Sequence, residues 1–143
     1  MNVESILKSK GRSVFTVRPD ANVADAVALL HRHGIGALVV SQDKASVDGI
    51  LSERDIVHAL SAHGGQSLEL TVAQLMSRRV VTCKPSDTVA DLMALMTDRR
   101  IRHLPVVEHG RLAGMISIGD VVKNRLDEIE SEATSMREFI AGA

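Results

Sequence analysis

Residues 49–55 have the sequence GILSERD, and residues 114–120 have the sequence GMISIGD. Both stretches follow one pattern: a glycine, two apolar residues, a serine, two variable residues and an aspartate. The likeness continues upstream at a nearly constant spacing, where Pro19 falls on Pro85 and residues 23–25 (VAD) recur as residues 89–91. Ordered matches at a fixed offset indicate a chain built from one unit twice.

Each copy predicts a strand, a helix, a β hairpin and a closing helix. Apolar residues in 22–33 recur at the spacing of one helical face, and Gly34 is placed to end that helix. In the second copy, Thr88 is a candidate N-cap with Asp91 three residues later. The remaining predicted segments are the hairpin strands 35–40 and 49–52, the hairpin strands 104–107 and 112–117, and short helical lead-ins at 3–7 and 72–76.

The predicted fold class is α/β (α+β), with two repeats that each contain a small three-stranded sheet and two helices. One repeat of about 60 residues makes a marginal core, so the two should pack together about an approximate two-fold axis. The predicted boundaries are residues 1–62 for the first repeat, 63–70 for a linker, 71–126 for the second repeat and 127–143 for a C-terminal helix.

Composition limits the possible functions. A net charge of -1, from 17 basic and 18 acidic residues, gives no broad attraction to nucleic acid or membranes. We find no apolar signal core at the start and no later run long enough to span a bilayer, so we expect a cytoplasmic protein. Cys83 is the single cysteine and is expected to be a small buried hydrophobe. We also find no nucleophile–base pair, phosphate loop or metal-ligand cluster, so we predict neither an enzyme nor a metal protein.

The repeated serine and aspartate have two interpretations. Ser52 with Asp55, and Ser117 with Asp120, fit capping boxes that only stabilise the closing helices. The same geometry also suits a nucleoside phosphate, because a helix N-terminus favours anions and a carboxylate accepts hydrogen bonds from both ribose hydroxyls. Arg54 adds a cation beside the first of these helix starts.

Three stretches carry a family resemblance: SERDIV (52–57), RIRHLPVV (100–107) and GMISIGDVV (114–122). With the doubled repeat, residues 3–126 resemble the CBS (cystathionine beta-synthase) domain family. The resemblance implies a Bateman-type regulatory module that binds AMP, ADP, ATP, NAD(H) or S-adenosylmethionine without a catalytic cofactor. It also implies that the module is often a homodimer, senses energy or redox state, and controls an unknown partner protein.

The resemblance also implies contacts for each part of the ligand. The two serines and two aspartates would contact phosphate or ribose, and adenine would lie near the first strand of a copy. The residues implied around adenine are Thr16, Val17 and Pro19 in the first copy, or Thr82, Cys83 and Pro85 in the second. A rival interpretation within the family is a CBS pair with empty clefts that acts only by docking onto another protein.

The two copies differ where their second strands begin. The second copy has Arg102 and His103 where the first has Gly36 and Ala37. We hypothesise that these two basic side chains reach across the repeat axis to phosphates held near Asp55. The alternative is that both are solvated surface residues.

The C-terminal segment predicts a helix with one narrow apolar seam. Its apolar residues alternate steps of four and three among charged residues. Packing onto the same chain and contact across a dimer both remain open, and we favour the dimer. The seam residues are Val122, Leu126, Ile129, Ala133, Met136 and Ile140.

Overall fold

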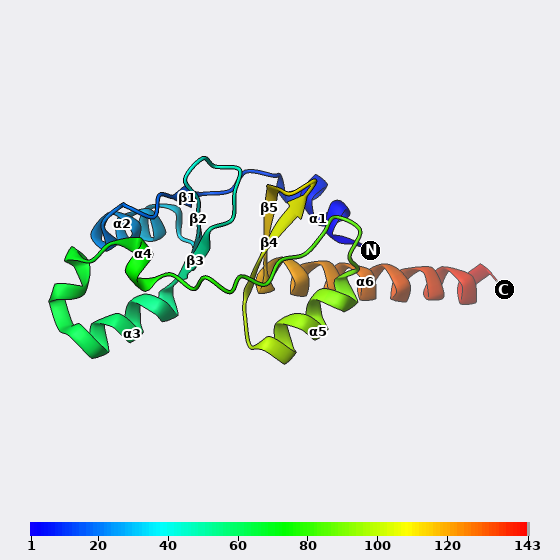
Figure 1. The fold of residues 1–143 in the computed structure, drawn as a ribbon. Coiled ribbons are helices and arrows are strands. Elements are labelled where there is room, and N and C mark those ends of the chain that lie inside the picture. Colours follow the sequence, from blue (N-terminus) through cyan, green and yellow to red (C-terminus); the bar gives the residue numbers. More distant parts are fainter. Residues whose placement is uncertain (143) are drawn as a thin grey trace.

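The computed structural model describes residues 1–142, which form two α/β halves side by side with one long helix extending away from them (Figure 1). The predicted fold class is confirmed. In chain order the elements are α1 (Val3–Lys10), β1 (Thr16–Val17), α2 (Val23–His33), β2 (Ala37–Val40), β3 (Gly49–Ser52), α3 (Glu53–His63), η1 (Gly64–Glu69, a 3-10 helix), α4 (Val72–Leu75), α5 (Val89–Arg99), β4 (His103–Glu108), β5 (Arg111–Ser117) and α6 (Ile118–Gly142).

The two sheets have the same plan but different completeness. In the first, β1 runs parallel to β2, and β2 pairs antiparallel with β3. In the second, β4 pairs antiparallel with β5, and the strand expected before them is one parallel bridge between Cys83 and Val106. Pro105 lies at the place of Val39 and has no N–H to donate, so a longer parallel ladder cannot form. The second repeat therefore has two strands and a bridge.

The two short lead-in helices are exchanged between the halves. Val3, Ile6 and Leu7 of α1 are buried in the core of the second repeat, whereas Val72 of α4 is buried in the core of the first. Each core thus takes its lead-in helix from the segment that precedes the other repeat. The limits 1–62 and 71–126 stay a prediction about the sequence repeats, and the packed cores do not follow them.

Matched backbone hydrogen bonds hold the exchanged helices in place. Val3 N–H donates to the Asp87 carbonyl, and Val72 N–H donates to the Ala21 carbonyl, both at 2.9 Å. Asp87 and Ala21 come just before the equivalent helices α5 and α2. The same contact made in both directions is what an approximate two-fold relation between the repeats requires.

The last helix is continuous from the second repeat to Gly142. Among its described residues, Val121 is buried, and the predicted apolar seam is exposed along its whole length. Within this chain, packing of the seam onto its own module is therefore wrong. The segment predicted as a linker is ordered as η1, with Ser67 buried and its Oγ donating to the Ala59 carbonyl at 2.8 Å.

Candidate functional site

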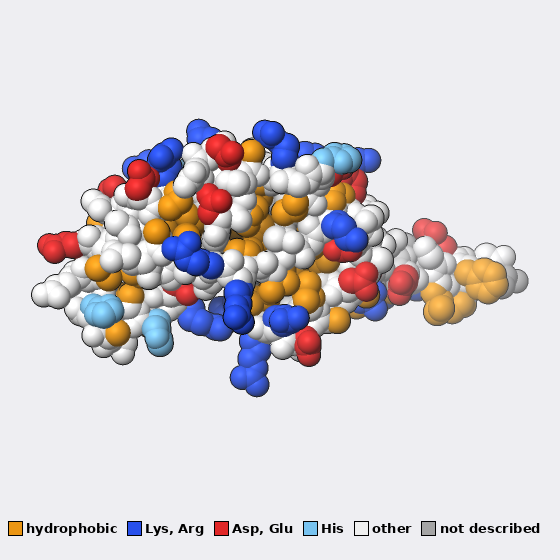
Figure 2. All heavy atoms as spheres, viewed as in Figure 1, with side chains coloured by type: hydrophobic (Ala, Val, Ile, Leu, Met, Phe, Trp, Pro, Cys, Tyr) orange, Lys and Arg blue, Asp and Glu red, His pale blue; other side chains and the backbone are white. Residues whose placement is uncertain are grey.

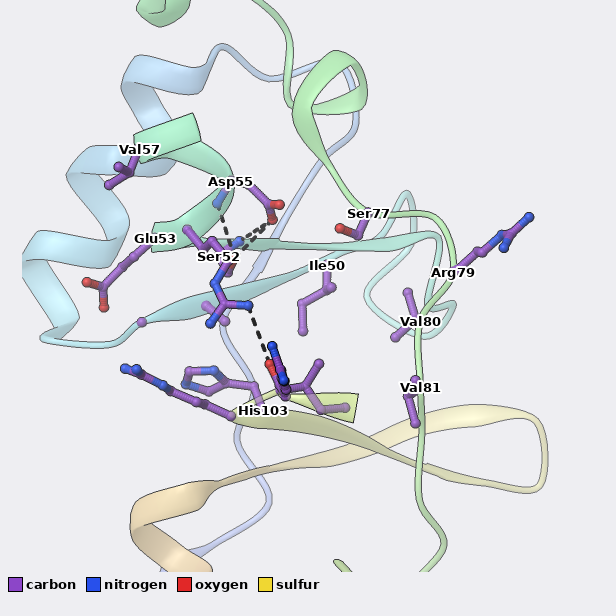
Figure 3. Close-up of a pocket in the computed structure, with 16 residues that line it drawn as sticks. Ile50, Ser52, Glu53, Asp55, Val57, Ser77, Arg79, Val80, Val81 and His103 are labelled. Atoms are coloured by element: carbon purple, nitrogen blue, oxygen red, sulfur yellow. Dashed lines mark hydrogen bonds between the residues drawn. The ribbon is translucent and has the colours of Figure 1, made fainter. Parts of the chain in front are cut away.

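A cavity of about 470 Å³ lies between the two halves and is lined by both (Figure 3). One wall comes from β2, β3 and the start of α3, and the opposite wall comes from the segment after α4 and the entry to β4. Its lining residues are Gly36, Ala37, Ile50, Ser52, Glu53, Arg54, Asp55, Val57, Ser77, Arg79, Val80, Val81, Arg100, Ile101, Arg102 and His103.

Ser52 and Asp55 form a capping box at the start of α3, on the wall of this cavity. The Ser52 N–H and Oγ donate to Asp55 Oδ2 at 2.8 and 3.0 Å, and the Asp55 N–H donates to Ser52 Oγ at 3.3 Å. The capping interpretation is therefore correct as a description of local structure. Within residues 1–142 these bonds use one carboxylate oxygen of Asp55, which leaves Oδ1 as a free acceptor beside the cavity.

Basic side chains dominate the charge around the cavity. Arg54 and Arg79 line it together with Arg100 and Arg102, against two carboxylates. Figure 2 shows basic side chains grouped between the two halves on the face in view. The Arg54 guanidinium also donates to the Arg100 carbonyl across the repeats at 3.4 Å. An anionic group entering the cavity would therefore meet a positive field, to which the partial positive charge at the N-terminus of α3 adds.

His103 lies on β4 at the boundary between the repeats and faces the cavity in Figure 3. The backbone of Gly36 lies close to the His103 ring. A Cβ added to this glycine would lie 2.7 Å from Glu53 Oε1 and 3.2 Å from the His103 ring, so a larger residue would not fit without a shift of these side chains. Burial lowers the pKa of His103 below its usual 6.5, with Lys10 and Arg102 acting in the same direction, although Glu53 and Asp120 oppose it. The imidazole is therefore neutral near pH 7.

The second motif has the same capping geometry but a different neighbour. Ser117 N–H and Oγ donate to Asp120 Oδ2 at 2.8 and 3.0 Å, and the Lys10 ammonium donates to the same oxygen at 2.7 Å. Burial opposes ionisation of Asp120, but the hydrogen bonds from Lys10 and Ser117 outweigh it, so the pKa of Asp120 is lowered. Asp120 is thus an ion-paired carboxylate.

The structure brings six of the predicted residues to one cavity. Arg102 and His103 of the second repeat line it together with Ala37, Ser52, Arg54 and Asp55 of the first, as the cross-repeat hypothesis requires. The other eight lie outside its lining: Thr16, Val17, Pro19, Thr82, Cys83, Pro85, Ser117 and Asp120. The side chains of Val17 and Cys83 are buried in the two cores. The part any of these residues takes in binding stays a prediction.

Sequence reasoning missed several residues of the cavity wall. Val80 and Val81 come directly before the predicted adenine segment of the second copy. Two valines before a strand are common in any sheet protein, so they do not by themselves indicate a binding site. Arg79 and Arg100 also line the cavity and were not among the predicted site residues. The comparison of the two copies pointed to Arg102 and His103 but not to Arg79 or Arg100, which only the packing of the repeats brings to the cavity that Asp55 lines.

A family model for the CBS domain matches the chain twice, at residues 3–62 and 72–127. The chain belongs to the CBS domain family. The predicted resemblance is thereby confirmed, and the two halves are a tandem CBS pair.

Relatives of this CBS pair span nearly its whole length. The CBS domain-containing protein CBSX3 of Arabidopsis thaliana, described as mitochondrial, is 34% identical over 98% of this chain and 72% of its own length. The crystal structure of ATU1752 from Agrobacterium tumefaciens is 48% identical with a TM-score of 0.85, covering 87% of this chain and 99% of that one.

A more distant structural relative has a bound ligand. The CBS domain pair of protein MJ0100, in complex with 5′-methylthioadenosine and S-adenosyl-L-methionine, has a TM-score of 0.79 at 22% identity, over 90% of this chain and 98% of that one. At this identity the likeness concerns the fold alone.

Two further properties bear on the site. No helix within residues 1–142 is both long enough and apolar enough to cross a bilayer. Over the same residues, His, Cys, Asp and Glu side chains form no cluster of three that could hold a metal ion.

Proposed function

We propose that this CBS pair is a regulatory module that binds an adenine nucleotide, AMP, ADP, ATP or NAD(H), and catalyses no reaction. The observation that carries the proposal is the cavity that Asp55 lines together with arginines from both repeats. The occupancy of this cavity would report energy or redox state to a partner protein. The cytoplasmic location stays a prediction from the sequence.

The chemistry of the wall fits the parts of a nucleotide. The open acceptor of Asp55 suits a ribose hydroxyl, as acidic residues do in dinucleotide sites. Arg54 and Arg102 supply the planar forks of donors that bind phosphate, and the start of α3 adds the partial positive charge of its helix dipole. Ile50, Val80 and Val81 offer aliphatic surface for adenine, next to the predicted segment 82–85.

The charge of the cavity selects within the family's range of ligands. S-adenosylmethionine carries a sulfonium cation, which the four arginines would repel, whereas phosphate groups would be attracted. MJ0100 supports the general proposal, because a CBS pair of the same fold accommodates adenosine compounds. For this chain we therefore favour phosphate-bearing adenosine ligands over that cation.

Replacement of the cavity aspartate tests the proposal. We expect Asp55→Ala to weaken AMP or ATP binding about 10- to 100-fold, because a charge-assisted hydrogen bond contributes about 1.5–3 kcal/mol. Isothermal titration calorimetry measures the change, and Asp127→Ala, on the exposed part of α6, is the matched control. Arg102→Ala should also weaken binding. Equal affinities for all four proteins would contradict the proposed site.

A second candidate function is a CBS pair that acts by protein docking alone. The exposed apolar seam of α6 favours this alternative, because it leaves a surface for another chain. A thermal-shift series with AMP, ATP, NADH and S-adenosylmethionine separates the two. A bound ligand at about one hundred times its dissociation constant adds about 2.7 kcal/mol of stability, so unchanged melting with all four would leave only docking.

A further inference from the structure

Lys10 is bound to the carboxylate of the second motif, Asp120, which matches Asp55 of the first. Its ammonium donates to Asp120 Oδ2 at 2.7 Å and to the Met115 carbonyl at 2.8 Å. Lys10 is the last residue of α1, the lead-in helix whose apolar face is buried in the second repeat. The ammonium is therefore held by a packed helix as well as by its two acceptors.

The repeat relates this ion pair to the open cavity of the first half. Met115 and Asp120 hold the positions that Ile50 and Asp55 hold in the first copy. Ile50 and Asp55 both line the 470 Å³ cavity. The backbone of Ile50 is hydrogen-bonded to the backbone of Ser77, and no side chain takes part in that contact. In the second copy a cation bridges the two matching positions, so the same motif is open in one half and filled in the other.

We propose that Lys10 is the residue that restricts nucleotide binding to the Asp55 cleft, by serving as a built-in occupant of the Asp120 cleft. The inference rests on the proposed function, since it concerns how many nucleotides the pair holds. A ribose that approaches Asp120 meets a carboxylate whose charge the Lys10 ammonium already compensates at Oδ2. The Asp55 carboxylate has no such partner among its side-chain contacts within residues 1–142.

The lowered pKa of Asp120 agrees with this arrangement, because it reflects stabilisation of the ionised carboxylate by Lys10 and Ser117 in spite of burial. A ligand hydroxyl is a weaker donor to a carboxylate than an ammonium is. Exchange of one for the other is therefore unfavourable unless Lys10 is removed.

The stoichiometry of ATP and AMP binding, measured by isothermal titration calorimetry on the full chain, tests the inference. We expect one nucleotide per chain for the unmodified protein and two for Lys10→Met, which keeps the apolar stem of the side chain and removes the ammonium. Lys8→Met, an exposed position on the same helix, should stay at one. Asp55→Ala should keep one site, weakened about 10- to 100-fold, and Asp55→Ala with Lys10→Met should show that weakened site together with one new site.

The possible results separate this inference from the function on which it rests. One nucleotide for both the unmodified chain and Lys10→Met would overturn the inference and leave the proposed function standing. Two for the unmodified chain would overturn it as well, and a loss of one of them in Lys10→Met would make Lys10 a phosphate ligand. No binding to any protein would refute the proposed function itself. If Lys10→Met is poorly folded by circular dichroism, Lys10→Gln, which retains a donor, should also bind two.

Discussion

Arg100 ends α5 in a left-handed backbone conformation, with φ 54° and ψ 45°. The equivalent helix α2 ends at Gly34, which has φ 60° and ψ 40°. A left-handed backbone is unfavourable for any residue with a Cβ and easy for glycine. Arg100 also lines the cavity. The chain thus places an arginine at a strained position where its first copy uses glycine.

We expect Arg100→Gly to make the protein more stable and its nucleotide binding weaker. Relief of the left-handed conformation should add about 0.5–1 kcal/mol to the free energy of unfolding, after allowance for the greater freedom of glycine in the unfolded chain. Urea denaturation and calorimetric titration with ATP measure the two effects. Arg100→Ala removes the charge but keeps the strain, so it should weaken binding without the gain in stability. A less stable Arg100→Gly would show that the backbone is not strained.

His103 makes stability depend on pH in a defined window. Because burial holds its pKa below the ordinary 6.5, the unfolded chain binds a proton there that the folded chain does not. By linkage, the folded state is favoured above pH 6.5 and loses stability as the pH falls below it towards the folded pKa. We expect the urea midpoint to drop between pH 7 and pH 5.

His103→Gln should flatten this pH dependence, since the replacement does not titrate. His109→Gln is the matched control, because the side chain of His109 is 90% exposed. Asp120 acts in a separate window, since its pKa lies below 3.8 and its contribution is lost only as the pH falls below that value. An unchanged slope in His103→Gln would contradict the assignment to His103.

At the scale of elements, the first glycine of each repeated motif allows the exchange of the lead-in helices. A Cβ on Gly114 would lie 2.6 Å from Leu7 Cδ2 of α1, and a Cβ on Gly49 would lie 2.7 Å from Met76 Sδ, at the end of α4. Both glycines are therefore needed for close approach of a helix that precedes the other repeat. The motif therefore has two structural roles. Its glycine allows a lead-in helix to pack closely, and its serine and aspartate cap the helix that follows the motif.

We expect Gly114→Ala to reduce the free energy of unfolding by about 1–3 kcal/mol, because the added methyl overpacks the contact with Leu7. Gly119→Ala is the matched control in the same motif. A Cβ there has its nearest neighbour at 3.6 Å and lies in the first turn of α6, so stability should stay the same or rise by up to about 1 kcal/mol. Urea denaturation followed by circular dichroism makes the comparison. Equal stabilities would show that α1 does not depend on close packing at Gly114.

At the scale of the whole molecule, α6 carries an apolar surface that no other part of residues 1–142 covers. Figure 2 shows hydrophobic side chains along its free end, beyond the two halves. Leu126, Met136 and Ile140 are 60%, 66% and 68% exposed. A contiguous exposed apolar surface is typical of an interface between proteins. This surface supports the proposed homodimer.

We expect the unmodified chain to be a dimer in sedimentation equilibrium, and Ile129→Glu with Met136→Glu to raise the dissociation constant at least tenfold. Two buried carboxylates without partners would oppose association. Ser131→Glu, on the opposite side of the helix, should leave the dimer intact. A monomeric unmodified chain would contradict the proposed homodimer.

The sequence alone determined the architecture and the family, because these depend on local signals that are repeated. The GhhSxxD motif occurs twice with its serine and aspartate at the start of a helix, and capping is a contact between residues three apart. Helical spacing and the helix-ending Gly34 fixed α2 in the same way. The placement of Arg102 and His103 near Asp55 could be predicted, since it followed from comparison of the two copies, and all three residues line one cavity.

Only the tertiary structure decided which repeat supplies each wall of the cavity and which core each lead-in helix covers. The exchange of α1 and α4 cannot be predicted from the sequence of either repeat. The apolar residues of an amphipathic helix show which face is buried, but they do not show which core buries it. The same is true of Lys10, which lies 110 residues from Asp120 and yet donates to its carboxylate. The two matching motifs differ because long-range packing, rather than local sequence, brings an ammonium into direct contact with Asp120, whereas Asp55 lines an open cavity.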